Sequence, residues 1–398
     1  MRLAQERRRD NHQWILDWVI KETGMVQNFE RERMSVPSSV KSYAMIPKIM
    51  GKVASHHEEI ALKAEEAGHY QTARELYLSA VQHYHTAQHS IFQDGNKLKI
   101  QFHQALLRCY DKAMHYAGHP VELVEVPWEG VNIQCSLHLL PDRQKAPCVV
   151  YVPGMDQTKE VVPAGVFVQR GMHVIVMDGP GQGTSNIRKI RVTDDNYERA
   201  GAAVVDYLIT LPEVDPQRIA VFGLSMGSFW GTRIAAHDQR VRAAAVRSVC
   251  VGDKTAIFEQ SSPRFKQVFM YMAGIRDEDE FDQMAAKMTT VGYGRGITCP
   301  FLITTGEYDP LRPLEESERL YEELAGPKEL WVVENSFHGA QIQDGLEGID
   351  CLPFMADWLK DALAGKYGLG HSRYVYIQDG RGAGPYAEGV KEFASMTA

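Results

Sequence analysis

The chain of 398 residues is 44% hydrophobic, enough to build a sizeable core in two domains or in one large domain with additions. Its net charge of −8 argues against nucleic acid as a main partner, because phosphate binding requires a basic face. The sequence has neither an apolar stretch of membrane-spanning length nor a signal-peptide h-region, so we expect no membrane attachment and a cytoplasmic location.

Residues 1–120 carry helical patterning, and we treat them as a helical N-terminal region. Apolar residues recur at i, i+3 and i+4 spacing in segments 55–67, 70–92 and 97–116. The predicted helix breakers are Gly68, Asp94-Gly95-Asn96 and Gly118-His119-Pro120. In the first predicted helix, four apolar side chains indicate a docking face for a homodimer: Trp14, Ile15, Trp18 and Val19.

The pattern changes to alternating strands and helices near residue 120. Segments 121–126 and 131–140 are typical of antiparallel edge strands, and strands and helices then alternate to Leu363. Such alternation predicts a mostly parallel, doubly wound sheet of the α/β class. We assign residues 121–365 to this core. Residues 366–398, which are rich in glycine and aromatic residues, form a C-terminal tail to which no role is assigned.

The pentad Gly223-Leu224-Ser225-Met226-Gly227 lies between an apolar run, residues 219–222, and a stretch compatible with a helix. A serine on a sharp strand-to-helix turn presents its hydroxyl above the sheet, and glycines beside it give the backbone room for the turn. The same short pattern occurs in ordinary glycine-rich turns. Its assignment as a nucleophile elbow therefore depends on the residues that follow.

Residues 253–296 lie between the strand that follows the elbow and the next strand of the core, and they contain no convincing strand. We expect them to form a helical cap over the site, because ligand pockets tend to form between such units. The aromatic and methionine side chains of this segment are candidates for the pocket lining or for the cap core: Phe258, Phe265, Phe269, Met270, Tyr271 and Met272.

Two later strand ends carry an aspartate and a histidine, in the chain order of a Ser-Asp-His triad. The apolar run 299–305 leads into a loop with Asp309, and the run 329–333 leads into a loop with His338. In such a triad the imidazole takes the proton of the serine, and the carboxylate fixes the tautomer of the imidazole. We therefore predict Ser225 as nucleophile, His338 as base and Asp309 as its carboxylate partner. Glu307, in the same loop as Asp309, is the alternative carboxylate.

A triad of this kind needs N–H donors for the oxyanion that forms at the attacked carbonyl. One donor is the backbone amide of Met226, the residue after the nucleophile. For the other we nominate the amide of Met155, on the glycine-containing loop after the apolar run 148–152, with Asp156 as its neighbour. The glycine-rich segment 178–183 follows another predicted strand and is expected to shape the rim of the site.

Six cysteines occur singly, without a CxxC pair, and three of them lie in apolar runs. We expect them to be reduced core residues, not parts of a disulfide framework or a zinc site. The chain also lacks a Cys/His cluster at ligand spacing and a dinucleotide fingerprint after a first strand-to-helix turn. We therefore predict an enzyme without a metal and without a cofactor.

The loop Gly154-Met155-Asp156-Gln157-Thr158-Lys159-Glu160 resembles a signature of the 2,6-dihydroxypseudooxynicotine hydrolase-like family. Fungal hydrolases that shorten polyketide pigments are similar too. The likeness covers most of the chain, because the helical region, elbow, cap and triad partners occur at matching intervals. The sequence departs from the family pattern at Met155, which replaces a glycine; this changes the pocket wall but not an amide donor.

This resemblance implies an α/β-hydrolase fold and hydrolysis of a carbon–carbon bond next to a ketone in an aromatic or polyketide-like substrate. Cleavage of such a bond releases a carbanion, which must be delocalised and protonated. The family is associated with an extra carboxylate beyond the strand after the elbow, and segment 257–263 resembles that region. Glu259 is thus a candidate substrate-binding residue or auxiliary acid, and Asp156 is the other candidate for this role. A solvated glutamate of the cap is the alternative interpretation of Glu259.

Other functions remain as alternatives to C–C bond hydrolysis. The same triad would serve a carboxylesterase or a lactonase, since the family also includes esterases. A different class of function is a hydrolase scaffold that binds a ligand without catalysis, or a helical-hairpin interaction module with a vestigial enzyme. The intact set of triad residue types counts against both.

Overall fold

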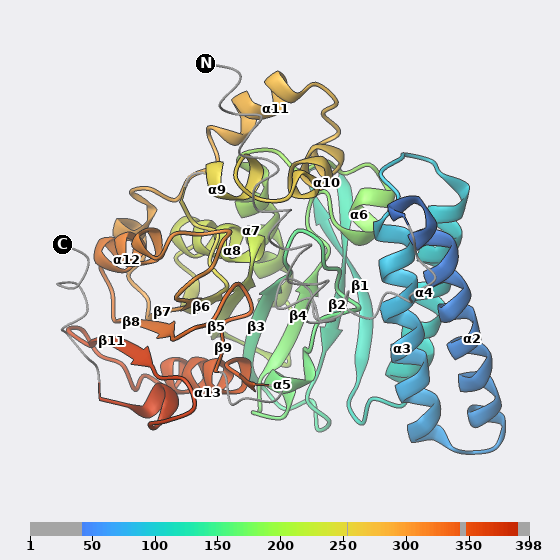
Figure 1. Ribbon diagram of the computed structural model, residues 1–398. Coiled ribbons are helices and arrows are strands. Elements are labelled where there is room, and N and C mark those ends of the chain that lie inside the picture. The colour runs from blue at the N-terminus through green and yellow to red at the C-terminus, as the bar shows by residue number, and fades with distance from the viewer. Residues whose placement is uncertain (1–41, 253, 343–347, 389–398) are drawn as a thin grey trace.

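The computed structural model describes residues 42–252, 254–342 and 348–388. Its centre is a nine-stranded sheet in the order β1-β2-β4-β3-β5-β6-β7-β8-β11 (Figure 1). β1 and β2 form an antiparallel hairpin at one edge, β2 is antiparallel to β4, and the remaining neighbours are parallel. The strands are β1 (Val121–Trp128), β2 (Val131–His138), β3 (Ala146–Val152), β4 (His173–Met177), β5 (Val214–Leu224), β6 (Val241–Arg247), β7 (Phe301–Gly306), β8 (Lys328–Val333) and β11 (Ser372–Ile377).

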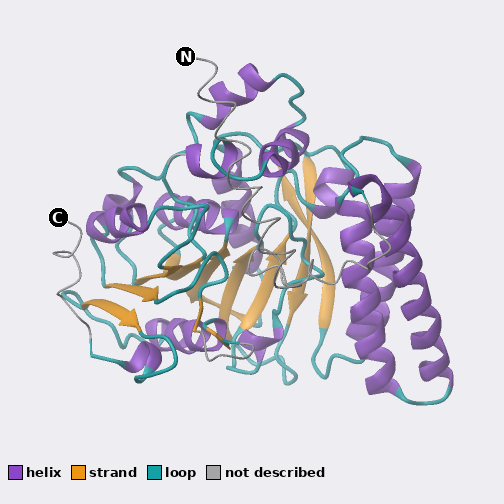
Figure 2. Cartoon of the chain, viewed as in Figure 1, coloured by secondary structure: helices purple, strands orange, loops and turns teal. Residues whose placement is uncertain are grey.

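Helices cover both faces of this sheet, as Figure 2 shows. All five residues of β4 are buried, which explains why the parallel strands are continuous apolar runs in the sequence. One hydrophobic cluster joins the sheet to α5 (Gly165–Val168) and α13 (Leu352–Leu363). A second cluster joins it to α7 (Asn196–Leu208), α8 (Met226–His237) and α12 (Leu314–Glu323). A short helix, α6 (Gly183–Ile187), follows β4.

The strand order reverses at β3, because β4 lies on one side of β3 and β5 on the other. The helix after β3, α5, packs on one face of the sheet, and the helix after β5, α8, packs on the opposite face. The loops that leave these two strands therefore diverge. In open α/β sheets a ligand site lies at such a reversal, beyond the carboxyl ends of the strands.

Within the described residues, three long helices precede the sheet and stand beside its β1 edge (Figure 1). They are α2 (Ile46–Glu66), α3 (Tyr70–His89) and α4 (Lys97–His115). Small buried residues such as Ala54, Ala61 and Ala73 allow close packing between them, and Tyr110 of α4 bonds Ser136 of β2 through their hydroxyls at 2.7 Å. The predicted breakers coincide with the ends of these helices. The predicted docking face of residues 14–19 lies outside the described residues.

The predicted start of the first of these helices differs from the structure. The apolar spacing placed it at Ser55, whereas α2 begins at Ile46, with Pro47 in its first turn. Proline is well tolerated there, because the first turn has no intrahelical acceptor for its missing N–H. The third of these helices, α4, begins after Asn96. The Asn96 side chain accepts hydrogen bonds from the amides of Leu98 and Lys99 and so caps the start of the helix.

Helices α9 (Thr255–Phe258), α10 (Pro263–Ala273) and α11 (Glu278–Ala285), with a 3₁₀ turn at Tyr293–Gly296, connect β6 to β7. They stand above the sheet in Figure 1. Phe258, Phe269 and Phe281 make edge-on ring contacts with centroids 5.0–5.9 Å apart, so they form the core of this segment. No strand occurs between Thr255 and Gly296 in the described residues, as the sequence predicts.

The predicted boundary of the core at residue 365 is too early. β11 (Ser372–Ile377) pairs in parallel with β8, with Val375 opposite Trp331, and so extends the sheet. The segment assigned to a tail therefore includes a strand with three buried residues, 375–377. A short antiparallel pair, β9 (Gln341–Ile342) and β10 (Ile349–Asp350), lies apart from the main sheet.

The described part of the chain contains neither a membrane-spanning helix nor a disulfide bond. None of its helices combines the length and the apolar character needed to cross a membrane. Its six cysteines form no disulfide bonds with one another, and five of them are buried.

Candidate active site

Ser225 occupies a sharp turn between β5 and α8. Its backbone has φ 55° and ψ −123°, a conformation that non-glycine residues rarely adopt. The neighbouring glycines make the turn sterically feasible: a Cβ atom on Gly223 would lie 2.2 Å from the carbonyl oxygen of Gly227. The Ser225 amide donates to the Arg247 carbonyl at 2.9 Å, which holds the turn against β6. This is the geometry predicted for a nucleophile elbow.

The structure brings Ser225, His338 and Asp309 into one hydrogen-bonded line. Nε2 of His338 lies 2.8 Å from Oγ of Ser225, and Nδ1 of His338 lies 2.8 Å from Oδ2 of Asp309. Both His338 and Asp309 are buried. Asp309 follows β7, and its Oδ1 accepts the amide of Leu311 at 2.9 Å, which fixes the carboxylate. The arrangement has the contacts that general-base activation of a serine requires.

Glu307, the alternative carboxylate, has other partners. Its Oε2 accepts the backbone amide of Asn335 at 3.0 Å. Burial raises the pKa of Tyr376, and a hydrogen bond to Glu307 raises it further. The carboxylate of this loop that contacts the imidazole of His338 is that of Asp309.

The loop after β3 passes directly beside Ser225. A Cβ atom on Gly154 would lie 3.2 Å from Cβ of Ser225, so glycine permits this approach. Met155 follows and is buried. Nε2 of His85, on α3, bonds the carbonyl of Asp156 at 2.8 Å, which anchors the loop to the N-terminal helices.

Met226 is the first residue of α8, and the amides of the first turn of a helix have no intrahelical acceptor. The donor roles of Met155 and Met226 stay predictions.

A buried ion cluster joins this loop to the segment after β4. Nζ of Lys159 lies 2.5 Å from Oε1 of Glu160 and 2.8 Å from Oδ2 of Asp178, and all three side chains are fully buried. Asp178 also accepts the amide of Thr184 at 2.8 Å. Burial lowers the pKa of Lys159, but the two carboxylates outweigh it and hold the pKa above its usual value. The cluster keeps the two loops in fixed relative positions.

Glu259 lies just after α9 and forms an ion pair within the cap. Its Oε1 lies 2.8 Å from Nζ of Lys266, which also lies 2.6 Å from Asp282 and 3.3 Å from Glu278. The Glu259 side chain is 15% exposed. These contacts give Glu259 a structural partner, and its role toward a substrate stays a prediction.

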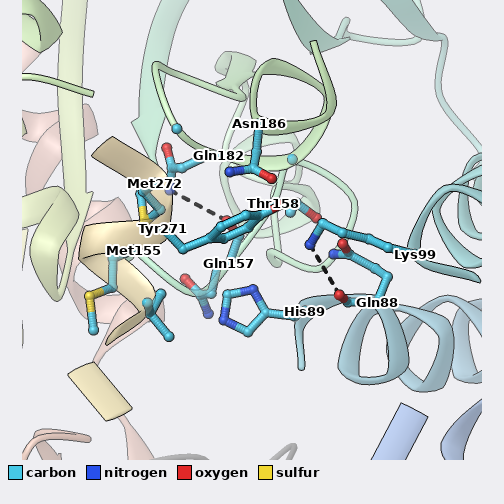
Figure 3. A pocket seen from close by; sticks show the side chains of 13 residues that line it. Gln88, His89, Lys99, Met155, Gln157, Thr158, Gln182, Asn186, Tyr271 and Met272 are labelled. Carbon is cyan, nitrogen blue, oxygen red and sulfur yellow. Dashed lines mark hydrogen bonds between the residues drawn. The ribbon is translucent and has the colours of Figure 1, made fainter. Parts of the chain in front are cut away.

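A pocket lies between the N-terminal helices, the loop after β3 and the cap (Figure 3). Tyr271 and Met272 of α10 line it, whereas Phe258 and Phe269 belong to the cap core. Nε2 of Gln182 donates to the Gly154 carbonyl at 2.7 Å and connects the pocket wall to the loop beside Ser225. Its residues are Gln88, His89, Lys99, Met155, Gln157, Thr158, Gly181, Gln182, Gly183, Asn186, Val268, Tyr271 and Met272.

Sequence reasoning missed most of these lining residues. Gln88 and Lys99 come from α3 and α4, more than 120 residues before Ser225, and ordinary helical patterning gives no sign of a ligand site there. In the described part of the chain, no three His, Cys, Asp or Glu side chains are arranged to hold a metal ion.

The family described as "Esterase FrsA-like" matches residues 52–364. The 2,6-dihydropseudooxynicotine hydrolase of Paenarthrobacter nicotinovorans is 29% identical over 322 residues, which span 79% of this chain and 84% of that protein. The alpha/beta hydrolase xenA of Xenoacremonium sinensis is 31% identical over 231 residues, which span 54% of this chain and 53% of xenA. The chain thus matches about half the length of xenA.

Among solved structures, 2,6-dihydroxy-pseudo-oxynicotine hydrolase matches with a TM-score of 0.71. The alignment covers 88% of this chain and 96% of that chain, at 24% identity. At this identity the likeness shows the fold alone. The predicted fold class and the predicted resemblance are confirmed by these matches.

Proposed function

Because the chain belongs to the FrsA-like esterase family and is a hydrolase, we propose that it cleaves a carbon–carbon bond next to a ketone in an aromatic or polyketide-like substrate, with Ser225 as nucleophile. The observation that carries the proposal is the hydrogen-bonded line from Ser225 through His338 to Asp309. The preference for a C–C bond comes from the family resemblance of the sequence. It is supported by the likeness to a hydrolase named for 2,6-dihydropseudooxynicotine.

In the first half of this reaction, Ser225 Oγ attacks the ketone carbonyl as Nε2 of His338 takes its proton. The oxyanion accepts hydrogen bonds from the amides of Met226 and Met155. Collapse breaks the C–C bond and leaves an acyl group on Ser225. The electron pair of that bond stays on the departing carbon, which takes the proton held by His338 and leaves as a neutral molecule, a ketone where the substrate is a 1,3-diketone.

In the second half, His338 activates water to attack the acyl group. The C–O bond to Ser225 breaks, the serine regains a proton, and the product is a carboxylic acid. Asp309 holds the imidazole in the tautomer that has its proton on Nδ1 and stabilises the imidazolium in both halves. The sum is addition of one water to one C–C bond.

Hydrolysis of a carboxylic ester or lactone is the second candidate. Two observations favour it: the family is described as an esterase family, and Glu259, the predicted auxiliary acid, is ion-paired with Lys266. An ester releases an alkoxide or phenoxide, which needs less stabilisation than a carbanion. The reaction would use the same triad and the same oxyanion donors.

A matched pair of substrates separates the two candidates. Phenyl benzoate and 1,3-diphenylpropane-1,3-dione both present a benzoyl carbonyl and both yield benzoate, but the second requires C–C cleavage and releases acetophenone. In H₂¹⁸O we expect benzoate with one ¹⁸O from the diketone, and none from either substrate with Ser225→Ala. Labelled benzoate from the ester alone would favour the esterase. Labelled benzoate from neither would contradict both candidates.

A further inference from the structure

The pocket between α3, α4 and α10 contains a lysine with an unusual environment. Lys99 is 5% exposed, and Nζ donates to the carbonyl of Gln88 at 3.1 Å. The ammonium also lies 5.1 Å from the centroid of the Tyr271 ring. An ammonium has three N–H donors, and no carboxylate is among the described residues that line this pocket. Burial lowers the pKa of Lys99, and Asp94, which opposes this effect, is itself ion-paired with Arg191. The buried ammonium is therefore only partly compensated, and the site favours an anion from outside the chain.

Two more polar groups of the pocket wall lack partners among the described residues. Both the amide nitrogen and the amide oxygen of Asn186 are buried without a hydrogen bond, and so is the hydroxyl of Thr158. Asn186 is 6% exposed and Thr158 is 3% exposed. Buried polar groups in folded proteins almost always have partners, so unpaired ones along one wall point to a ligand or to water. Figure 3 shows Lys99, Thr158 and Asn186 in one view of this pocket.

The rest of the wall mixes apolar and polar side chains, the polar ones being Gln88, His89, Gln157 and Gln182. Met155, Val268 and Met272 contribute apolar surface, and Tyr271 contributes a ring. Met155 also belongs to the loop beside Ser225, so a ligand in this pocket would lie against the proposed oxyanion loop. The pocket thus combines some apolar surface with one cation and several neutral hydrogen-bonding groups.

We propose that this pocket binds an oxyanion of the substrate, such as an enolate, phenolate or carboxylate, with Lys99 as its charge partner and Asn186 and Thr158 as hydrogen-bond donors. The inference rests on the proposed function, because it names the class of substrate that the Ser225 site accepts: a molecule with an acidic oxygen. The free volume of about 20 Å³ has room for the oxyanion and not for a ring. Cyclic 1,3-diketones, acidic phenols and aryl carboxylates have this chemistry. Lys99 binds substrate and takes no part in bond cleavage.

Binding to the full-length Ser225→Ala protein tests the proposal without turnover, so its failure is distinct from failure of the proposed reaction. The probes are benzoate, the enolate of 1,3-cyclohexanedione and the neutral benzamide, measured by calorimetry at pH 7. We expect at least one anion to bind tenfold or more tightly than benzamide. Binding of the enolate but not benzoate would identify an enolic substrate, and the reverse would identify a carboxylate.

Substitutions in the same Ser225→Ala background locate the anion. Lys99→Met should weaken anion binding tenfold or more, whereas Lys97→Met removes an exposed lysine of the same helix and should leave it unchanged. Asn186→Asp, which keeps the side-chain shape but adds a negative charge, should also weaken it. Unchanged anion binding in both Lys99→Met and Asn186→Asp, in proteins that melt normally, would overturn the proposal and place any anion at the oxyanion amides. Equal binding of benzamide and both anions would overturn it as well.

Discussion

A Cβ atom on Gly227 would lie 2.1 Å from the carbonyl oxygen of Val152, so the start of α8 meets the end of β3 without room for a side chain. This close approach brings the loop after β3 beside the serine that precedes α8. The position of the proposed oxyanion donors therefore depends on the second glycine of the elbow pentad.

Replacing this glycine tests that dependence. Gly227→Ala should lower the free energy of unfolding by about 1–3 kcal/mol, because the backbone has to move to admit the methyl group. It should also reduce ester turnover, since the same movement displaces the oxyanion donors. Gly165→Ala is the control, because a Cβ atom there meets nothing within 4 Å. Chemical denaturation and steady-state turnover measure the two effects, and a Gly227→Ala protein as stable and active as Gly165→Ala would contradict the argument.

The carboxylate of the triad can be distinguished by two conservative substitutions. Asp309→Asn should lower turnover on the order of 10⁴-fold, because the amide no longer holds the required imidazole tautomer. Glu307→Gln should have little effect on turnover, because Glu307 bonds the amide of Asn335 rather than His338. Steady-state rates of both folded variants decide between them. A reversal of the two effects would make Glu307 the third member of the triad.

Glu259 is tested by comparing leaving groups. A carboxylate near a departing carbanion matters to C–C cleavage alone, so Glu259→Gln should slow diketone cleavage at least tenfold, about 1.4 kcal/mol in barrier, and barely change hydrolysis of an aryl ester. Lys266→Met removes the ion-pair partner and keeps the carboxylate. Equal losses on both substrates with both variants would instead show that the pair only holds the cap in shape.

Anion binding in the proposed pocket should depend on pH. Burial lowers the pKa of Lys99 to about 7, against an opposing effect of Asp94. An anion stabilises the ammonium and raises this pKa in the complex. The affinity for benzoate should therefore be greatest below pH 7 and fall, at most about tenfold per pH unit, as the pH rises above 7. Other titratable or charged groups around the pocket are His85, His89, His103, Lys159, Arg191 and Tyr271, and burial lowers the pKa of His103 to about 3. Calorimetry from pH 6 to pH 9 checks this, and a flat profile would contradict it.

Local pattern was sufficient to predict the elbow, the loops with Asp309 and His338, and the helices of the N-terminal region. Each of these depends on residues within one strand-to-loop unit or one helix. β11 was missed because its six residues follow a glycine-rich stretch and gain their burial from pairing with β8. The pocket was missed because Lys99 and Asn186 come to line the same pocket only after α4 packs beside the sheet. The ion pair of Glu259 with Lys266 likewise depends on tertiary packing of the cap.

The central claim is that Ser225 is the activated nucleophile, and covalent labelling tests it without knowledge of the substrate. A fluorophosphonate reacts with a serine whose proton is taken by a neighbouring base, so the native protein should gain one adduct by intact mass. Peptide mapping should place that adduct on Ser225, and neither Ser225→Ala nor heat-denatured protein should be labelled. An adduct at another residue, or undiminished labelling of Ser225→Ala, would contradict the account.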